Sequence, residues 1–445
     1  MNWKEFLKKH KLEEGQLVKI IEGKEEYKGS ILPSTEEDKE ILRLKLNSGY
    51  NVGLKITEKL KVEKLEGTQK VGKAKTEKIK QKEGLPTIAI LHTGGTIASR
   101  VDYKTGAVNT TFDEEDLLTM YPEIAGKCNL VSKHLSNMWS DDMRFEHYKV
   151  MAKAIQEMIK KNVKGIIIGH GTDTLHYTSA ALSFMLENVP IPVLIVGAQR
   201  SSDRGSSDAA MNLDCAAEFI LKTDFAGVGV CMHHSSNDDK CSVINGCKAR
   251  KMHSSRRDAF KAINDTPIAL IDYKTKKIDF LKNNYQRRNN GKNFKIKDAM
   301  EEKVAILKIH TNMFPEQFEF YYKNGFKGVV IEGTGLGQTP GFVSDEHNKI
   351  HAKLWKSLEE LCKKCLVVVT TQTIYGRVHQ HVYDKGVEVA KLGAIGCEDM
   401  TTETAFVKLA WLLGNYKKEE AKKLITQNLR GEINKTLPYE EEIGE

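Results

Sequence analysis

Two similar strand-to-loop segments, called the first and second corner below, constrain the fold of the chain more than any other feature. Apolar residues 88–91 lead into Thr93-Gly-Gly-Thr-Ile97, and apolar residues 166–168 lead into Gly169-His-Gly-Thr-Asp-Thr174. Each run has the length of a buried strand, and each is followed by glycine, which lets the backbone approach a ligand, and by hydroxyl side chains. One such corner alone is equally typical of an ordinary tight turn. Two of them predict a sheet with a ligand site beyond the carboxyl ends of its strands.

Strands and helices alternate from residue 87 to about 272, which predicts a parallel α/β sheet. Residues 146–161 place one apolar face on a helix, formed by Tyr148, Met151, Ala152, Ile155, Met158 and Ile159. A segment rich in Asn, Lys and Arg follows, and beyond it a smaller α/β unit resumes. We therefore expect two α/β domains, at 85–283 and 301–445, joined by a linker at 284–300. Their strands are expected at 165–168, 192–197, 227–232, 304–309, 328–332 and 366–371, and further helices at 174–186, 206–221 and 404–413.

The first 65 residues form a separate unit, because short β-rich segments there alternate with charged, Gly or Asn turns. We expect a small antiparallel β-barrel at 1–65 and a polar, lysine-rich linker at 66–84. The barrel lacks the interleaved aromatic residues of a base-stacking platform, which favours docking to a partner over reading nucleic acid.

Composition excludes several classes of protein. A chain of 445 residues is too long for one core, and no run of eighteen apolar residues could span a membrane. Its start lacks an apolar signal region, which predicts a cytoplasmic protein. The net charge of +8 is mild and carried by lysine, so it indicates solvated surface. The eight cysteines lie in apolar contexts typical of reduced thiols. The paired Cys or His spacing of a zinc site is not repeated in the sequence, so we expect no metal site.

Three ordered motifs resemble a known family. Thr93-Gly-Gly-Thr-Ile97, His170-Gly-Thr-Asp-Thr174 and Lys251, followed nine residues later by Phe260, are similar to the bacterial-type L-asparaginases over residues 86–415. The resemblance implies a two-domain asparaginase-like architecture of parallel sheets, here preceded by the small antiparallel barrel.

Further stretches resemble one branch of that family more closely, the D subunits of archaeal glutamyl-tRNA(Gln) amidotransferases. These stretches are Val101-Asp-Tyr-Lys-Thr-Gly-Ala-Val108, Gln199-Arg-Ser-Ser-Asp-Arg204 and Ser254-Ser-Arg-Arg-Asp-Ala-Phe260. That branch carries a small β-barrel ahead of its asparaginase-like part. The resemblance implies a glutaminase subunit that hydrolyses glutamine, or asparagine, through a threonine acyl-enzyme.

The resemblance also assigns catalytic roles. It implies that Thr93 is the nucleophile and that Thr172, Asp173 and Lys251 form the base group. A lysine can act as a base only if burial or a nearby positive charge lowers its pKa, and Arg250 could supply that charge. Judged by its basic neighbours alone, Lys251 would instead be an ordinary surface lysine.

Substrate contacts follow from the same resemblance. Asp173 is expected to bind the α-ammonium of an amino-acid substrate as well. Ser140 and Asp141 match the position where the family holds the α-carboxylate and amino ends, although Asp141 is shorter than the Gln or Glu common there. Gly171 is expected to line the same site. Asparaginases place a tyrosine in the loop after the first corner; Tyr103 is the candidate here, and a solvent-facing loop residue is the alternative.

The resemblance implies partners too. It predicts a tRNA-binding, ATP-using partner subunit that holds ATP and Mg²⁺, no cofactor or metal in this chain, and contact with tRNA(Gln) mainly through the partner. It also predicts a homodimer within a heterotetramer. Two alternatives remain at this point: a free-standing L-asparaginase, for which the barrel and linker have no evident use, and a non-enzymatic binding protein, which leaves both hydroxyl-bearing corners and Lys251 unexplained.

Overall fold

The structure, a computed structural model, describes residues 2–23, 25–32, 39–46, 51–65, 82–94, 100–101, 108–109, 124, 126–200 and 207–437. Within these ranges, no helix has the length and apolar character needed to cross a membrane. Most of the linker expected at 66–84 lies outside the described residues.

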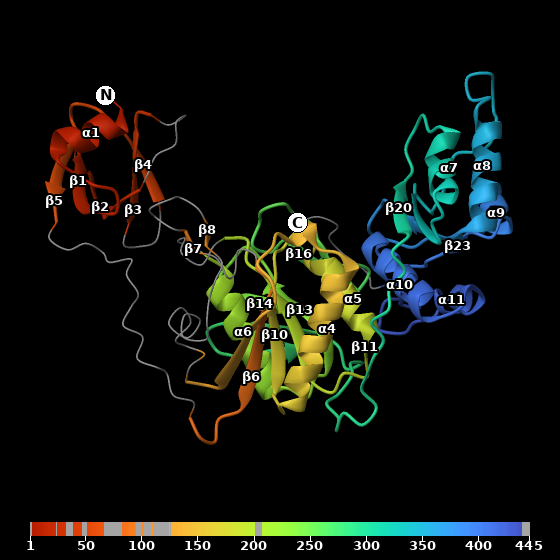
Figure 1. Cartoon of the computed structure of the whole chain (residues 1–445), viewed down its shortest axis with the longest axis horizontal. Helices are drawn as coiled ribbons and strands as arrows, with labels where there is room; N and C mark the ends of the chain where they lie inside the picture. Colours follow the sequence, from red (N-terminus) through yellow and green to blue (C-terminus); the bar gives the residue numbers. More distant parts are fainter. Residues whose placement is uncertain are drawn as a thin grey trace.

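The N-terminal unit is a five-stranded antiparallel sheet with one short helix (red in Figure 1). Its strand order is β4-β3-β2-β1-β5, and the sheet curves around a core that includes Phe6, Val18, Ile20, Ile31 and Leu42. The helix was not anticipated from the sequence; Asn2 and Glu5 form a capping box at its start. The elements are α1 (Trp3–His10), β1 (Leu17–Glu22), β2 (Glu25–Leu32), β3 (Ile41–Leu46), β4 (Asn51–Lys55) and β5 (Lys61–Lys64).

The first α/β domain is built on an eight-stranded sheet in the order β18-β17-β14-β13-β12-β10-β6-β9. Neighbours among the five strands β13, β12, β10, β6 and β9 pair in parallel, as expected. The pairings of β14 with β13, of β17 with β14 and of β18 with β17 are antiparallel. Only residues 234–239 connect β13 to β14, which is too short for a parallel crossover. The strands are β6 (Thr87–His92), β9 (Asn129–His134), β10 (Gly165–Gly169), β12 (Pro192–Val196), β13 (Gly227–His233), β14 (Lys240–Asn245), β17 (Ala269–Asp272) and β18 (Ile278–Phe280).

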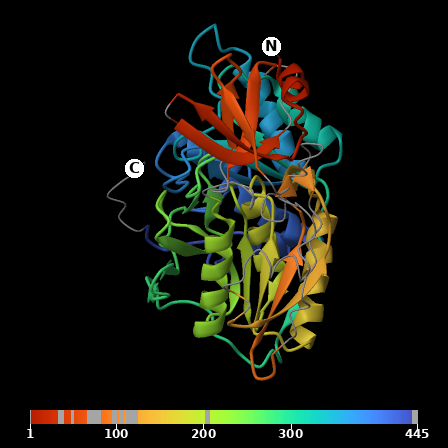
Figure 2. The same cartoon turned by 90° about the vertical axis from the view of Figure 1, so that its left-hand side faces the viewer.

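Helices cover both faces of this sheet because alternate strand residues point to opposite sides. Helices α4 (Phe145–Lys160) and α5 (Leu175–Met185) share a core with Ile166 and Ile168, and α6 (Ala209–Lys222) shares another with Ile167. Figure 2 shows α6 (green) and α4 (yellow) on opposite sides of the strands. The apolar face predicted for residues 146–161 is confirmed, since its members are buried or packed against the core. Small elements complete the domain: β7 (Arg100–Val101), β8 (Val108–Asn109), η2 (Ser140–Asp142), β11 (Leu186–Glu187), β15 (Ala249–Lys251) and β16 (Phe260–Ala262).

The C-terminal domain is a parallel sheet in the order β20-β21-β22-β23. It shares a core with the first domain, because Trp411 of α10 stacks on Phe184 of α5 with ring centroids 5.6 Å apart. Lys248 and Asp399, both fully buried, add an ion pair of 2.6 Å across the same boundary. The elements are β20 (Val304–Lys308), α7 (Pro315–Lys323), β21 (Gly328–Gly333), α8 (His351–Lys364), β22 (Leu366–Thr371), α9 (Asp384–Lys391), β23 (Ile395–Gly396), α10 (Thr402–Asn415) and α11 (Lys418–Leu424).

The polar segment at 284–300 forms hydrogen bonds with the first domain at several positions. Arg288 donates hydrogen bonds to the carbonyls of Ile220 and Thr223 at the end of α6. Strand β19 (Lys295–Ile296) then pairs with β11. The basic side chain therefore satisfies carbonyls that the end of a helix leaves without partners.

Candidate active site

Thr93 lies at the carboxyl end of β6 and is almost fully buried. Its backbone amide and its hydroxyl each donate to the carbonyl of Gly169, at 3.1 Å in both cases. Gly94 has φ +99°, and a Cβ there would lie 2.7 Å from the backbone nitrogen of Met138. The glycine of the first corner therefore lets this segment approach the chain that leads to Ser140. Residues 95–97 of the same corner lie outside the described residues.

The second corner follows β10, the strand next to β6 in the sheet. Lys251 Nζ donates to Thr172 Oγ1 at 2.9 Å and to Asp173 Oδ1 at 2.8 Å. Thr172 is buried, the Lys251 side chain is 10% exposed, and the Asp173 side chain is 68% exposed. The interpretation of Lys251 as an ordinary surface lysine is therefore wrong, because its amine lies against two residues of the corner.

The nine-residue spacing between Lys251 and Phe260 has a structural cause. The two residues face each other as partners in the β15–β16 hairpin, and Phe260 is buried in the core of the domain. The hairpin register therefore fixes the direction in which the lysine leaves the backbone.

Ser140 packs directly against the second corner. A Cβ on Gly171 would lie 2.9 Å from the Ser140 Oγ, so a glycine is required for this approach. The Thr174 hydroxyl donates to the Ser140 carbonyl at 2.5 Å, which ties η2 to the start of α5. Ser140 is buried and Asp141 is exposed. Tyr103 lies outside the described residues.

Gln199 is a site residue to which sequence reasoning gave no role. It follows β12, whose carboxyl end lies at the same edge as those of β6 and β10, and this position is the signal that could have found it. Thr172 Oγ1 lies 3.5 Å from Gln199 Oε1 and can donate to it. The side-chain Nε2 of Gln199 is buried and has no hydrogen-bond partner among the described residues.

Burial keeps the histidines near the site neutral. Burial lowers the pKa of His170 to about 4, and its ring is held between the Gly171 carbonyl and the Thr178 hydroxyl. Burial lowers the pKa of His176 to about 3, and the nearby side chains of Arg250 and Lys251 add to this effect. These rings carry no charge at neutral pH.

Arg250 points toward the C-terminal domain. Its guanidinium lies 3.1 Å from the Glu403 carboxylate on α10. Burial raises the pKa of Glu403, and the Arg250 charge opposes that rise. Arg250 is therefore paired with a carboxylate, so its charge acts on Lys251 less strongly than a free guanidinium would.

Cysteines and potential metal ligands indicate no second site in the part of the chain that the structure describes. The eight cysteines are free, and seven of them are buried. Burial raises the pKa of the Cys362 thiol to about 12, which leaves it a neutral thiol. Across the described residues, no group of three or more His, Cys, Asp or Glu side chains could hold a metal ion.

Known proteins are similar to this chain in all three of its units. Residues 87–286 match the family model of the asparaginase N-terminal domain, residues 303–425 the glutaminase/asparaginase C-terminal domain, and residues 12–65 the GatD N-terminal domain. Among solved structures, the thermostable L-asparaginase of Thermococcus kodakarensis has a TM-score of 0.69 at 29% identity and covers 79% of this chain and all of its own. L-asparaginase I of Vibrio cholerae has a TM-score of 0.66 at 25% identity, covering 79% of this chain and 99% of its own.

Curated relatives extend the likeness to nearly the whole chain. The D subunit of the glutamyl-tRNA(Gln) amidotransferase of Thermococcus kodakarensis is 44% identical over 98% of this chain and 97% of its own length. The protein of the same name from Pyrococcus furiosus is also 44% identical, over 99% and 98%. A third, from Methanococcus maripaludis, is 42% identical over 96% and 99%.

Proposed function

The chain belongs to the family of glutamyl-tRNA(Gln) amidotransferase D subunits, and we propose that Thr93 is the nucleophile with which it hydrolyses glutamine. It is the amidohydrolase component of the amidotransferase rather than a free-standing asparaginase, because the match to the family includes the N-terminal unit as well as both asparaginase-like domains. A non-enzymatic binding role leaves the contacts of Lys251 without a purpose.

The chemistry begins with the Thr93 hydroxyl. Its oxygen attacks the carboxamide carbon of glutamine, a C–O bond forms, and the hydroxyl proton passes to the base group of Thr172 and Lys251. Collapse of the tetrahedral intermediate breaks the C–N bond, and the same base group returns a proton to the departing ammonia. Water then releases glutamate from the threonine ester. The 2.9 Å contact between Lys251 Nζ and Thr172 Oγ1 is the observation that supports the base group.

Recognition of the amino acid falls to the residues around the second corner. Asp173 is exposed enough to meet an α-ammonium while it remains 2.8 Å from Lys251. Ser140 is buried and packs against Gly171, and Asp141 beside it offers a carboxylate to the amino end. Tyr103 remains the candidate for the loop tyrosine.

The ammonia is used by a partner subunit. The chain works with such a partner in the amidotransferase, as the name of its relatives implies. Our proposal adds that the partner binds tRNA(Gln) and uses ATP and Mg²⁺ to activate the glutamyl group, and that the N-terminal unit docks to it. A homodimer of this chain within a heterotetramer completes the proposal.

The test uses the full chain co-expressed with its tRNA-binding partner. Conversion of Glu-tRNA(Gln) to Gln-tRNA(Gln) is measured with glutamine and, separately, with ammonium chloride as nitrogen donor. Thr93→Ala should abolish conversion with glutamine and leave conversion with ammonium intact. If the variant still uses glutamine, Thr93 is not the nucleophile; if wild type fails with both donors, the chain does not serve this reaction.

A further inference from the structure

His233 sits at the end of β13, and its side chain is fully buried between two oxygen acceptors. Its Nδ1 lies 2.6 Å from Asn212 Oδ1 and its Nε2 lies 3.2 Å from Asp238 Oδ1. The orientation of the Asn212 amide is fixed, because its nitrogen donates to the Gly197 carbonyl and to Asp208. Both ring nitrogens of His233 therefore face oxygen atoms, one on α6 and one in the loop between β13 and β14.

The two contacts of His233 begin two series of interactions, which we call the two arms of its network. The first arm leads through Asn212 to Thr172. Asn212, on α6, donates to the Asp208 carboxylate at 3.3 Å. The carboxylate is fully buried and accepts hydrogen bonds of 3.0 to 3.1 Å from the backbone amides of Gln199 and Arg200. Because Gln199 Oε1 in turn accepts from Thr172 Oγ1, the first arm fixes the backbone that carries a direct partner of the base group.

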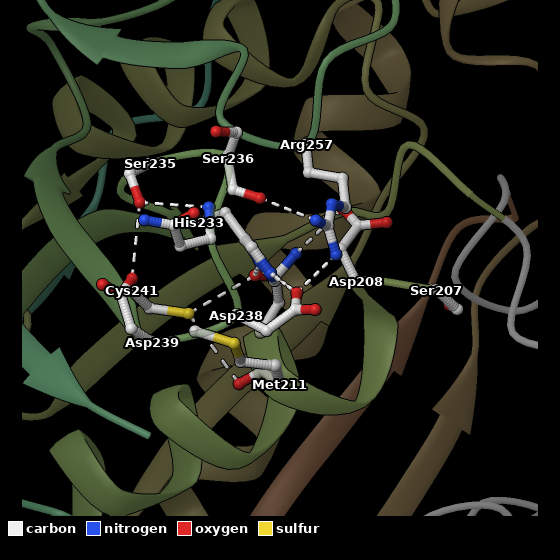
Figure 3. Close-up of polar contacts among 12 residues, drawn as sticks. Ser207, Asp208, Met211, His233, Ser235, Ser236, Asp238, Asp239, Cys241 and Arg257 are labelled. Carbon is white, nitrogen blue, oxygen red and sulfur yellow. Dashed lines mark hydrogen bonds and ion pairs between the residues drawn. The ribbon is translucent and has the colours of Figure 1, made fainter. Parts of the chain in front are cut away.

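The other arm leads to the loop that follows Lys251. Arg257 lies in that loop, residues 252–259, and its guanidinium pairs with Asp238. The same guanidinium donates to the Ser236 carbonyl at 2.6 Å. Figure 3 shows Asp238 between His233 and Arg257, with Cys241 and Asp208 nearby. The second arm therefore anchors the hairpin loop whose first strand ends at Lys251.

We propose that His233 is a positioning residue for the site, because it joins the segment of Gln199 to the loop of Arg257. This inference rests on the proposed function, since it concerns the same base group. Without the histidine, the two arms are no longer held to each other, and the 2.9 Å contact between Lys251 and Thr172 loses one of its constraints. A misplacement of about 1 Å costs up to about 100-fold in rate.

The first test is His233→Ala in the full chain, with glutamine hydrolysis as the assay. We expect kcat to fall by about 10- to 100-fold with KM nearly unchanged, because the residue touches no substrate. His234→Gln is the matched control. His234 contributes to the fold through its backbone, whose amide donates to Lys240 and whose carbonyl accepts from Lys261, and these contacts survive the change. An unchanged kcat in His233→Ala would overturn the inference.

A double-mutant cycle separates positioning from general destabilisation. If the two arms act as one network, adding Arg257→Ala to His233→Ala should cost no more kcat than the worse single variant. Full additivity would mean that the residues act independently and would contradict the proposal. Asp238→Asn, at a side chain 61% exposed, provides a second entry to the network should His233→Ala fold poorly, and a severalfold loss of kcat is expected.

Hydrogen exchange gives a readout that does not depend on catalysis. His233→Ala should speed exchange of the Gln199 and Arg200 amides, which donate to Asp208, and of the Met252 amide, which donates to Ala259. His234→Gln should leave these amides unchanged. An inactive wild type would contradict the proposed function, yet exchange would still decide the network: protection that is unchanged in His233→Ala refutes it.

Discussion

Replacing Lys251 with methionine tests the base group most directly. Methionine keeps an unbranched side chain of similar length and removes the amine, which donates to Thr172 at 2.9 Å and to Asp173 at 2.8 Å. Loss of a general base slows a reaction by about 10²- to 10⁴-fold. This range corresponds to about 3 to 5 kcal/mol of transition-state stabilisation. We therefore expect kcat for glutamine hydrolysis to fall at least about 100-fold.

The same change should barely affect stability. The Asp173 partner is 68% exposed, so its ion pair contributes about 0 to 1 kcal/mol. The hydrogen bond to Thr172 contributes about 1 kcal/mol, and the methionine side chain retains much of the packing of the lysine stem. The free energy of unfolding should fall by about 1 to 2 kcal/mol, and the folded state should persist under assay conditions.

Two other lysines provide controls for this experiment. Lys277→Met removes an exposed ion pair to Asp279 and should change neither kcat nor the melting temperature measurably. Lys248→Met removes the nearer cationic partner of the fully buried Asp399, leaves Arg377 at 3.8 Å, and should cost about 3 to 5 kcal/mol of stability. Steady-state kinetics and thermal unfolding of the three variants decide the matter. Near-wild-type kcat in Lys251→Met would make the lysine a bystander, and a rate loss matched by unfolding would make it structural.

Three further predictions address the rest of the chain. Thr93→Ala and Thr172→Ala should each reduce glutamine hydrolysis at least about 100-fold without loss of fold, as a rate assay and circular dichroism would show. A chain without the N-terminal unit and linker should still hydrolyse glutamine but lose transamidation with the partner; undiminished transamidation would refute docking. Burial lowers the pKa of His92 and His170 to about 4 and of His176 to about 3. The unfolded chain binds protons below about pH 6.5 where these folded rings do not, so stability should be full above that pH and fall toward pH 4 by about 1.4 kcal/mol per histidine per pH unit. Urea unfolding at pH 7 and pH 5 would check this, and equal midpoints would refute it.

The sequence alone determined the features that depend on local pattern. Apolar runs ending in glycine and threonine placed Thr93 and Thr172 at strand ends, because a buried strand and its following turn are encoded within about ten residues. The period of helix α4 identified its buried face for the same reason. Family resemblance in ordered motifs then pointed to Lys251, which no local pattern distinguishes from a surface lysine.

Tertiary structure decided everything that joins distant segments. Lys251 meets Thr172 across 79 positions of sequence only because the β15–β16 hairpin has one register. Strand order also placed Gln199 beside Thr172 and connected His233 to Gln199 through Asn212 and Asp208. The polar segment around Arg288, expected to be a linker, supplies donors to helix carbonyls. Contacts of this kind depend on strand order and packing, which are set by the burial of the whole domain and not by the residues on either side of a motif.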